Sequence, residues 1–463
     1  MARLVDMPVR TDSSSRMSAL ALKLYSQLMW LAQPLLRRKL VRRGRQEPGY
    51  RVAMEERFGS YTQPAELASE LVWVHAVSLG ETRTAALLLK AMRAQAPRLR
   101  ILLTHGTATG HEEGRALLKS IGQPGDIQAW QPWDSPASVN RFLDHFKPCL
   151  GLLMETEIWP NLVAEAKQRH IPLVLINGRL SPKSLKQAQN LASLSLPAYS
   201  ALSAVYAQTQ ADADRFLQLG APVVKVLGNL KFDATPDAAQ WAQGQAWRQA
   251  LAQPLLMFAS SREGEEDDFI KQIVSVALLN RSYNAINSIA NSVKLFKTLI
   301  VPRHPQRFEE VAALITHYGL RVSLRSQWAG NPADSLDAMN ADFWLGDSVG
   351  EMAMYYGMSD VALLGGSFAP LGGQNLIEAA ACGCPIVMGP HTFNFTEAAE
   401  LAQASGAAQR TENMAQAVRV ALDLIDAPEA LTAAAEAGLA FAARHRGATA
   451  HTLDSLQAYL RHI

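Results

Sequence analysis

The sequence predicts an α/β protein made of two doubly wound domains, each built around a parallel sheet. The chain has 463 residues, which is too many for one ordinary hydrophobic core. Short, unbroken apolar runs alternate with segments of helical composition, and such runs are typical of parallel strands that are covered on both faces. This alternation occurs in both halves of the chain, so we expect two domains that face each other across a cleft.

The boundaries of the predicted domains follow from the order of the apolar runs. Strands are expected in the first half at 71–78, 99–105, 127–131, 150–155, 172–177, 205–209 and 223–227. Strands are expected in the second half at 255–259, 298–301, 320–323, 343–345, 361–364 and 385–388. We therefore place the first domain at 46–232 and the second at 233–445, and a C-terminal helix at 446–463 can cross back to the first domain.

Residues 1–45 are expected to form a membrane anchor with a basic flank. The segment 19–36 is rich in Leu, Ala, Met, Tyr and Trp, but its length is marginal because a bilayer span takes roughly 20 mainly apolar residues. Its polar residues fall on one helical stripe together with Trp30, and its leucines lie elsewhere on the helix. Three alternatives stay open: an anchor that spans the bilayer, one that lies in the interface, and a helix packed on the protein itself.

The charges of the chain are unevenly distributed. A basic run follows the apolar segment directly, and its members are Arg37, Arg38, Lys39, Arg42, Arg43, Arg45 and Arg51. Such a run suits anionic lipid headgroups and predicts that the body of the protein lies on the cytoplasmic side of a membrane. The net charge of the whole chain is +2, which argues against nucleic acid as a partner. Three widely spaced cysteines and scattered histidines predict reduced thiols and no bound metal.

The stretch 364–378 is the most informative part of the chain, because an apolar strand runs into two glycine pairs and then into a helix. Glycines let the backbone approach a ligand closely, and free N–H groups at a helix start favour an anion. Glu378, in the first turn of that helix, can accept hydrogen bonds from ribose hydroxyls. A sugar-nucleotide pocket and a glycine-rich turn needed for tight packing are the two interpretations.

Polar residues follow the predicted strands of the first half, where a doubly wound sheet binds its ligand. Glu81 stands near the start of a helix, whose positive end favours the ionised carboxylate, and it is either a general base or a helix cap. Glu155 and Glu157 lie at the end of the fourth predicted strand, on chain expected to be extended, and we expect one of them to face the cleft and the other to be structural. Arg179 can hold an anionic sugar or a phosphate, or it is a surface arginine.

The second half carries a similar set of polar residues at its strand ends. Ser260 and Ser261 precede a helix, where a hydroxyl can cap the helix or hold a phosphate. Arg303 lies in a loop stiffened by prolines and is a candidate contact for a phosphate or a base. Ser348 and Glu351 precede a further predicted helix.

Taken in order, these segments closely resemble the 3-deoxy-D-manno-octulosonic acid (Kdo) transferases of Gram-negative bacteria. The resemblance covers nearly the whole chain and is carried by the N-terminal segment and by 57–59, 73–81, 154–161, 177–181, 228–233, 302–307 and 365–378. Gly178 and the pair Leu376 and Ile377 depart from the common pattern, but neither departure removes a charged residue. The family has the GT-B glycosyltransferase fold, in agreement with the two domains predicted above.

The resemblance implies an inverting glycosyltransferase that moves Kdo from CMP-Kdo to the lipid A precursor, lipid IVA, at the cytoplasmic face of the inner membrane. It implies no metal and no cofactor, Glu81 as the catalytic base, and anionic inner-membrane lipids as partners. The implied donor-side residues are Ser260, Ser261, Arg303, Ser348, Glu351, Gly373, Gln374, Asn375 and Glu378. The implied acceptor-side or sugar-binding residues are Arg57, Ser78, Gly80 and Arg179.

Other functions use the same architecture. A nucleotide-sugar 2-epimerase would need no lipid anchor, and a lipid A disaccharide synthase would use a UDP-sugar donor. A catalytically inactive membrane scaffold is disfavoured by the joint presence of Glu81, Arg303 and Glu378. The sequence leaves open the number of Kdo residues transferred, the oligomeric state, the depth of the anchor, and whether Glu155 or Glu157 faces the site.

Overall fold

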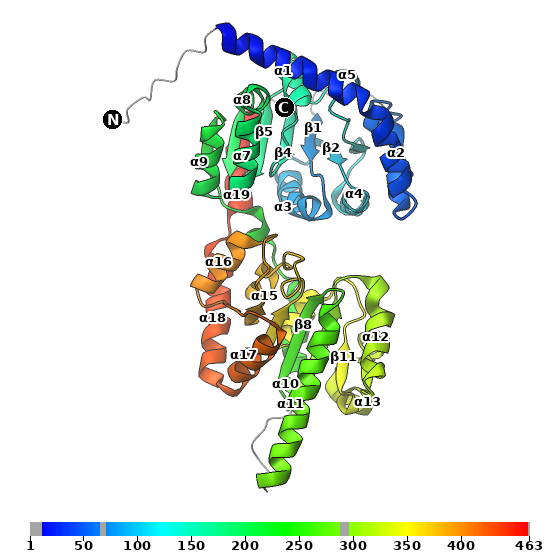
Figure 1. Ribbon diagram of the computed structural model, residues 1–463, viewed down its shortest axis with the longest axis vertical. Coiled ribbons are helices and arrows are strands. Elements are labelled where there is room, and N and C mark those ends of the chain that lie inside the picture. The colour runs from blue at the N-terminus through cyan, green and yellow to red at the C-terminus, as the bar shows by residue number, and fades with distance from the viewer. Residues whose placement is uncertain (1–11, 65–70, 288–295, 462–463) are drawn as a thin grey trace, which may run out of the picture. The chain divides into compact units, whose positions relative to one another are not determined.

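The computed structural model describes residues 12–64, 71–287 and 296–461 (Figure 1). The chain divides into two compact units, which we call unit 1 (Met1–Asp233 with Arg446–Ile463) and unit 2 (Ala234–His445). Each unit contains a seven-stranded parallel sheet, which confirms the predicted α/β class. Residues 1–11 of the expected anchor and 462–463 of the expected C-terminal helix lie outside the described residues.

The sheet of unit 1 has the strand order β3-β2-β1-β4-β5-β6-β7. Its strands are β1 (Leu71–His75), β2 (Arg100–His105), β3 (Ile127–Trp130), β4 (Leu150–Met154), β5 (Leu173–Gly178), β6 (Ala204–Ala207) and β7 (Val223–Val226). In chain order, the strands from β1 to β3 extend the sheet toward one edge, and those from β4 to β7 extend it toward the other. The carboxyl ends of β1 and β4 therefore form a topological switch point, where open α/β sheets bind their ligands.

Helices cover both faces of this sheet because successive residues of a buried strand point to opposite sides. Trp73 packs against Phe142 on one face, whereas Val74 belongs to the core on the other face, together with Leu88 and Leu453. The helices of unit 1 are α1 (Asp12–Leu31), α2 (Gln33–Arg43), α3 (Leu79–Gln95), α4 (Ala108–Ile121), α5 (Pro136–Phe146), α6 (Pro160–Gln168), α7 (Pro182–Asn190), α8 (Ala192–Ser200), α9 (Gln210–Gln218) and α19 (Ala448–Leu460). Its short 3-10 helices are η1 (Pro48–Arg51), η2 (Met54–Phe58) and η3 (Leu230–Asp233).

The sheet of unit 2 has the strand order β10-β11-β9-β8-β12-β13-β14, with its own switch point between β8 and β12. The strands are β8 (Leu255–Ser261), β9 (Lys297–Pro302), β10 (Val322–Leu324), β11 (Phe343–Leu345), β12 (Val361–Leu364), β13 (Ile386–Met388) and β14 (Ala408–Arg410). The helices are α10 (Ala238–Ala250), α11 (Glu265–Asn287), α12 (Phe308–His317), α13 (Leu336–Asn340), α14 (Met352–Gly357), α15 (Ile377–Ala381), α16 (Thr396–Ala404), α17 (Met414–Asp426) and α18 (Pro428–Arg444). The sequence did not predict β14.

The C-terminal helix α19 belongs to unit 1, where Figure 1 shows it in red. Leu453 and Leu456 are buried among residues of α3 and of the central strands. The Asp233 carboxylate accepts the N–H groups of Gly447, at 2.5 Å, and of Thr449. One carboxylate at the exit of unit 1 therefore caps the helix that follows the return of the chain.

We expect Asp233→Ala to destabilise unit 1 by about 1–2 kcal/mol, because the first N–H groups of α19 lose their acceptor. Urea denaturation followed by circular dichroism measures the change. Asp454→Ala, on the exposed side of the same helix, is the control. Equal stability of the two variants would contradict the capping role of Asp233.

Candidate active site

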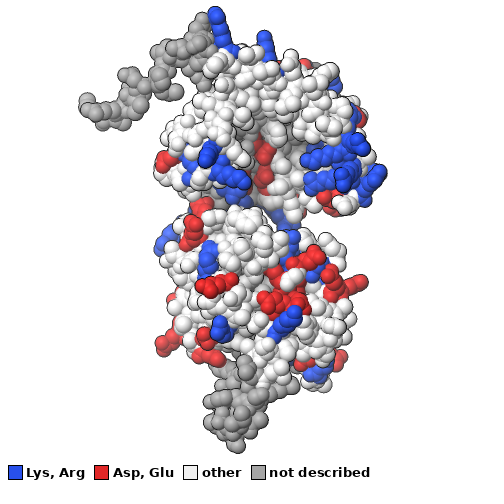
Figure 2. Space-filling model, viewed as in Figure 1, with Lys and Arg blue, Asp and Glu red and all other residues white. Residues whose placement is uncertain are grey.

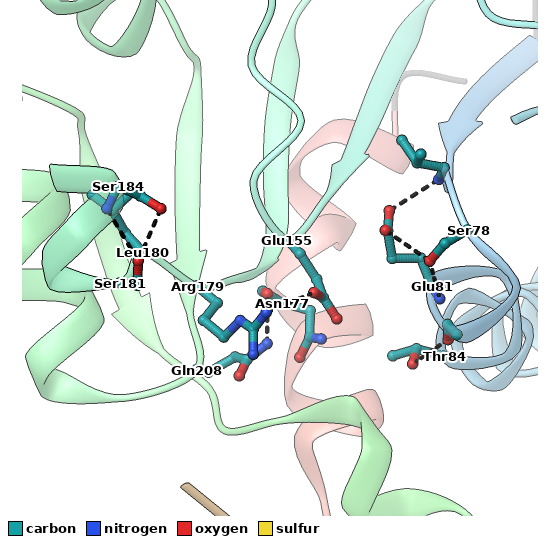
Figure 3. Close-up of polar contacts among 12 residues, drawn as sticks. Ser78, Glu81, Thr84, Glu155, Asn177, Arg179, Leu180, Ser181, Ser184 and Gln208 are labelled. Carbon is teal, nitrogen blue, oxygen red and sulfur yellow. Dashed lines mark hydrogen bonds and ion pairs between the residues drawn. The ribbon is translucent and has the colours of Figure 1, made fainter. Parts of the chain in front are cut away.

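Glu81 is held at the carboxyl end of β1, on the first turn of α3 (Figure 3). The Ser78 hydroxyl accepts the N–H of Glu81 at 3.3 Å and donates to its Oε1 at 3.0 Å. The Val77 N–H donates to its Oε2 at 2.9 Å. Gly80 is exposed, and a Cβ there would approach nothing nearer than the Ser78 hydroxyl, at 4.0 Å. Glu81 is therefore both part of a helix cap and a fixed carboxylate at the switch point.

Burial raises the pKa of Glu81 to about 7, and the charges of Glu155 and Glu157 act in the same direction. Hydrogen bonds from the Val77 N–H and the Ser78 hydroxyl oppose the shift, but the loss of hydration outweighs them. The expectation that the helix start favours the ionised carboxylate is therefore wrong in its net effect. A carboxyl group with a pKa near neutrality is suited to accept a proton from a hydroxyl.

The two glutamates after β4 do not lie on extended chain, so the extended conformation expected for them is wrong. β4 ends at Met154, and Glu155 adopts a left-handed backbone conformation with φ of +53°. Such a conformation is uncommon for a residue other than glycine and turns the chain at once. Both Glu155 and Glu157 raise the pKa of Glu81, so both carboxylates belong to its surroundings.

The buried Glu155 is compensated by two cations. Lys231 Nζ lies 2.9 Å from its Oε1, and Arg179 Nη2 lies 3.9 Å from its Oε2. The Arg179 N–H also donates to the Glu155 carbonyl, at 3.2 Å. Figure 3 shows Arg179 and Glu155 turned toward each other at neighbouring strand ends. Arg179 is thus tied to the glutamates of the site.

Glu157 lies in a less polar environment than Glu155. The Trp159 indole N–H donates to its Oε2 at 3.0 Å, and His75 Nε2 lies 4.0 Å from the same oxygen. Burial lowers the pKa of His75 to about 3, so this imidazole is neutral and supplies no opposite charge. Burial also raises the pKa of Glu157.

A cavity of about 250 Å³ in unit 1 has Glu157, but neither Glu81 nor Glu155, in its lining. Its walls come from α2, η1, η2 and the segments that follow β1 to β4, and they include Val77 and Glu157. Arg57 lines the cavity, stacks on Trp130 at 3.8 Å and donates to the Gly106 carbonyl at 3.0 Å. Arg57 therefore lines the same cavity as Val77, whose N–H donates to Glu81.

The helices α1 and α2 turn an apolar stripe toward solvent. Its members are 58–70% exposed and are Leu20, Leu24, Leu28, Leu31 and Leu35. The polar residues Ser26 and Gln33 instead contact the rest of unit 1. The Ser26 hydroxyl donates to Asn161 at 2.7 Å, and the Gln33 amide donates to the Ser135 hydroxyl at 3.1 Å. Trp30, expected on the polar side, is 64% exposed. A surface helix normally hides its leucines against the protein, so this orientation is the reverse of the usual one.

The basic run lies next to this stripe. Figure 2 shows lysines and arginines gathered over α2. Within residues 12–64, 71–287 and 296–461, no helix is both long enough and apolar enough to cross a bilayer.

The predicted donor residues of unit 2 lie at the end of β8 or after β9, β11 and β12, and these four strands are consecutive neighbours in the sheet. Ser260 has a left-handed conformation with φ of +53°, and the buried Ser261 hydroxyl donates to Glu266 Oε1 at 3.0 Å. Arg303 Nε donates to Gln374 Oε1 at 3.1 Å. The structure thus brings Arg303 and Gln374 together, whereas Ser261 is engaged inside the unit.

Ser348 and Glu351 are hydrogen-bonded to each other. The Ser348 hydroxyl also lies 2.5 Å from the Tyr355 hydroxyl, and Arg325 Nη2 donates to Glu351 Oε1 at 2.9 Å. These two residues form one polar group after β11.

The glycine-rich loop after β12 is ordered by a carboxylate of the protein itself. The buried Glu265 accepts the N–H groups of Gly366 at 2.7 Å, Phe368 at 3.1 Å and Ala369 at 3.0 Å. The Gly373 N–H donates to the Gly366 carbonyl at 2.7 Å. These four N–H groups are engaged within unit 2, and the N–H of Gly373, an implied donor-side residue, therefore already has an acceptor.

Tight packing explains Gly365, because a Cβ there would lie 2.2 Å from the Ser260 carbonyl oxygen. The helix α15 begins at Ile377, whose N–H is accepted by the Asn375 side chain at 3.1 Å. Glu378 is half-buried in the first turn of that helix, as expected.

A model of the 3-deoxy-D-manno-octulosonic-acid transferase (kdotransferase) family matches residues 53–234, which contain Glu81, Arg57 and Arg179. The chain is 43% identical to the 3-deoxy-D-manno-octulosonic acid transferase of Bordetella pertussis over 442 residues, which is 95% of this chain and 98% of that protein. The chain belongs to the Kdo transferase family. The Kdo transferase of Haemophilus influenzae is 31% identical over 443 residues, with 94% and 98% of the two chains covered. As a member of this family, the protein is a glycosyltransferase.

Solved structures show the architecture of this Kdo transferase. A glycosyltransferase from Rickettsia africae has a TM-score of 0.53 at 13% identity and covers 84% of this chain and 98% of its own. The UDP-GlcNAc 2-epimerase of Neisseria meningitidis has a TM-score of 0.52 at 15% identity and covers 84% and 100%. At such identities the likeness shows the fold alone, and that fold is the α/β fold of GT-B type expected from the sequence.

Several residues of the site were not found from the sequence of this Kdo transferase. Lys231 lies 76 positions from Glu155, and its segment carried the resemblance without an assigned role. Glu265 looks like any acidic residue in the first turn of a helix. Tyr50 and Gln131 line the cavity, but nothing in their local sequence marks them. Among the residues that the structure describes, no group of three or more His, Cys, Asp or Glu side chains could hold a metal ion.

The raised pKa of Glu81 predicts a pH-dependent stability. The folded protein binds the proton of Glu81 more tightly than the unfolded chain does, so this stabilisation is complete below about pH 4.5 and is lost as the pH rises toward about 7. We expect the wild type to lose about 1–2 kcal/mol relative to Glu81→Gln between pH 5 and pH 8, after allowance for solvent screening.

Urea denaturation of both proteins across this pH range measures the difference. Glu112→Gln, on the exposed side of α4, serves as the control. A constant difference between wild type and Glu81→Gln would contradict the raised pKa.

Proposed function

We propose that this Kdo transferase moves Kdo from CMP-Kdo to the lipid A precursor, lipid IVA, with inversion at the anomeric carbon and with Glu81 as general base. The observation that carries the proposal is the fixed, half-buried Glu81 carboxylate, which lies at a switch point within the segment matched by the family model. Its pKa of about 7 suits a general base. The transferases of Bordetella pertussis and Haemophilus influenzae support Kdo as the sugar.

In the proposed reaction, Glu81 takes the proton of the 6'-hydroxyl on the distal glucosamine of the acceptor. The oxygen forms a bond to the anomeric carbon of Kdo while the bond from that carbon to the CMP phosphate oxygen breaks. CMP leaves with the electron pair, and the proton stays on Glu81. Burial, together with repulsion from Glu155 and Glu157, makes Glu81 a stronger base than a solvated carboxylate, which favours the transfer.

The donor is proposed to bind at the carboxyl edge of the unit 2 sheet. The guanidinium of Arg303, positioned by Gln374, would stabilise the charge of the leaving phosphate. Glu378 would accept hydrogen bonds from the ribose. Since Glu265 occupies the N–H groups at the start of the glycine-rich loop, charge stabilisation falls mainly to Arg303.

We further propose that α1 and α2 lie in the interface of the inner membrane, with the rest of the protein on the cytoplasmic face. The exposed leucine stripe would enter the acyl boundary, and the basic run would meet anionic headgroups. The polar contacts of Ser26 and Gln33 with unit 1 support this orientation, because they direct the leucines away from the protein.

Replacement of the proposed base should remove activity without unfolding the protein. Kdo transfer from CMP-Kdo to tetraacyl lipid A precursor in detergent is expected to fall about 10²–10⁴-fold in Glu81→Gln. In the wild type, kcat/KM should rise with pH and level off above about pH 7. The mass of the product gives the number of Kdo residues added.

Full activity of a folded Glu81→Gln would reject Glu81 as base and direct attention to Glu155 and Glu157. A folded wild type without transfer would reject the proposed donor or acceptor.

The leucine stripe should determine binding to membranes. We expect the double change Leu24→Glu and Leu28→Glu to weaken flotation with anionic vesicles by more than about tenfold. The variant loses two apolar side chains that would enter the acyl boundary of the membrane. Leu336→Glu is the matched control, since Leu336 is 81% exposed in unit 2. Unchanged flotation of the double variant would contradict the proposed orientation.

A further inference from the structure

The glycine-rich loop of unit 2 is folded around one buried carboxylate. Glu265, in the first turn of α11, is 3% exposed. Its Oε1 accepts the N–H groups of Phe368 and Ala369, and its Oε2 accepts those of Gly366 and Arg262. Four hydrogen bonds from the backbone thus replace the lost hydration of this carboxylate, so the carboxylate and the loop stabilise each other.

A helix-capping role accounts for only one of these four hydrogen bonds. The Arg262 N–H lies three residues before Glu265 and donates to its Oε2 at 3.1 Å, which is the arrangement of a capping box at the start of a helix. The other three N–H groups belong to a loop that begins 101 positions later in the chain. A cap of α11 has no need of them, so Glu265 also fixes where this distant loop lies.

Gly366 connects the carboxylate to residues that are proposed to meet the donor. Its N–H donates to Glu265 at 2.7 Å, and its carbonyl accepts the N–H of Gly373 at 2.7 Å. A Cβ on Gly366 would lie 3.2 Å from Nε2 of Gln374, so the Gln374 side chain lies directly against the Gly366 Cα. A displacement of Gly366 would therefore displace Gln374 as well.

Gln374 in turn orients Arg303. Its Oε1 accepts the Arg303 Nε–H at 3.1 Å, and the Arg303 backbone N–H donates to the Ser261 carbonyl at 3.0 Å. The backbone of Arg303 is thus tied to the end of β8, while the Gln374 oxygen constrains the direction of the guanidinium. A guanidinium presents its donors in one rigid plane, so its orientation decides which of them reach a phosphate oxygen. One series of contacts thus leads from Glu265 to Arg303.

We propose that Glu265 is a positioning residue of the reaction, which acts through Gly366 and Gln374 to direct the guanidinium of Arg303 toward the leaving phosphate. The inference rests on the proposed function, which assigns Arg303 to that phosphate. Glu265 is buried and its two oxygens accept backbone N–H groups, so it acts on the donor through the residues that it holds.

Glu265→Gln tests the proposal because it keeps the size of the side chain. Glutamine has one amide oxygen, so two of the four N–H groups would face an NH₂ group that is itself a donor. We expect kcat/KM for CMP-Kdo to fall about 10–100-fold, because the guanidinium of Arg303 is misplaced. KM for the acceptor should stay the same.

Asp360→Asn is the matched control for a loss of stability in unit 2. The Asp360 carboxylate accepts the Leu255 N–H at 2.7 Å and pairs with Arg248 at 2.7 Å, at the amino edge of the same sheet. Its replacement should destabilise unit 2 and keep the wild-type kcat/KM. Equal kcat/KM in the wild type and in Glu265→Gln would overturn the proposal, and so would an equal loss of kcat/KM in Glu265→Gln and Asp360→Asn.

A double-mutant cycle separates positioning from other effects of the substitution. Because Glu265 is proposed to act through Gln374, the change Glu265→Gln should reduce kcat/KM much less in a protein that already carries Gln374→Ala than in the wild type. The same fold-loss in both backgrounds would overturn the proposal, because Glu265 would then act by another route.

Hydrogen exchange of the wild type provides a second measurement if Glu265→Gln does not fold. The amides of Gly366, Phe368 and Ala369 should exchange slowly in the free protein, and CMP should leave their rates unchanged, because Glu265 already accepts them. Rapid exchange of these amides in the free protein, with protection only after CMP is added, would overturn the proposal. In that case the ligand, and not Glu265, would order the loop.

Kdo transfer by the wild type separates a failure of this inference from a failure of the proposed function. A folded wild type that transfers no Kdo from CMP-Kdo would reject the proposed reaction and with it this role of Glu265. Transfer by the wild type, together with additive effects of Glu265→Gln and Gln374→Ala, would keep the reaction and reject only the positioning role.

Discussion

The burial of three neighbouring carboxylates at one switch point is the constraint on which the site of unit 1 depends. β1 and β4 are hydrogen-bonded neighbours, so the segments that follow them must lie side by side. Glu81, Glu155 and Glu157 all belong to these segments, and burial denies them the hydration that would screen their charges. Lys231 lies in η3, after the edge strand β7, and its Nζ pairs with Glu155 Oε1 at 2.9 Å, which balances one of the three charges. Glu81 receives hydrogen bonds but, within the part of the chain that the structure describes, forms no ion pair with a cation, and its proton affinity is high.

Unit 2 uses a carboxylate at its switch point in the opposite way. Glu265 is surrounded by N–H groups of the loop that follows β12, and each of them stabilises its negative charge. The loop is thereby ordered before any ligand arrives, and Gly365 permits its contact with the end of β8. The switch point of unit 1 thus holds a carboxyl group whose pKa is raised by burial and by neighbouring charges. The switch point of unit 2 holds a carboxylate that accepts several backbone hydrogen bonds. The first arrangement suits chemistry and the second suits binding.

The strands were predictable from the sequence because strands covered on both faces are apolar along their whole length, as in β1 and β4. β14 escaped prediction because Ala408–Arg410 is short and contains two polar residues. Strand ends also revealed Glu81, Arg179 and Arg303, since polar residues after a parallel strand lie at its ligand edge. The left-handed turn at Glu155 was not predictable, because a glutamate gives no local sign of it. Contacts between distant segments, such as Lys231 with Glu155, have no local signal at all.

The capping of α19 by Asp233 has a consequence for the order in which the chain is completed. Unit 2 is one continuous stretch, whereas unit 1 is interrupted by it and includes the final helix. During synthesis the whole of unit 2 leaves the ribosome before α19 does, so the hydrophobic face that α19 covers stays open until α19 has been made. Closure of that face needs a helix that the chain supplies only after unit 2, so the integrity of unit 1 depends on a segment on the far side of another unit.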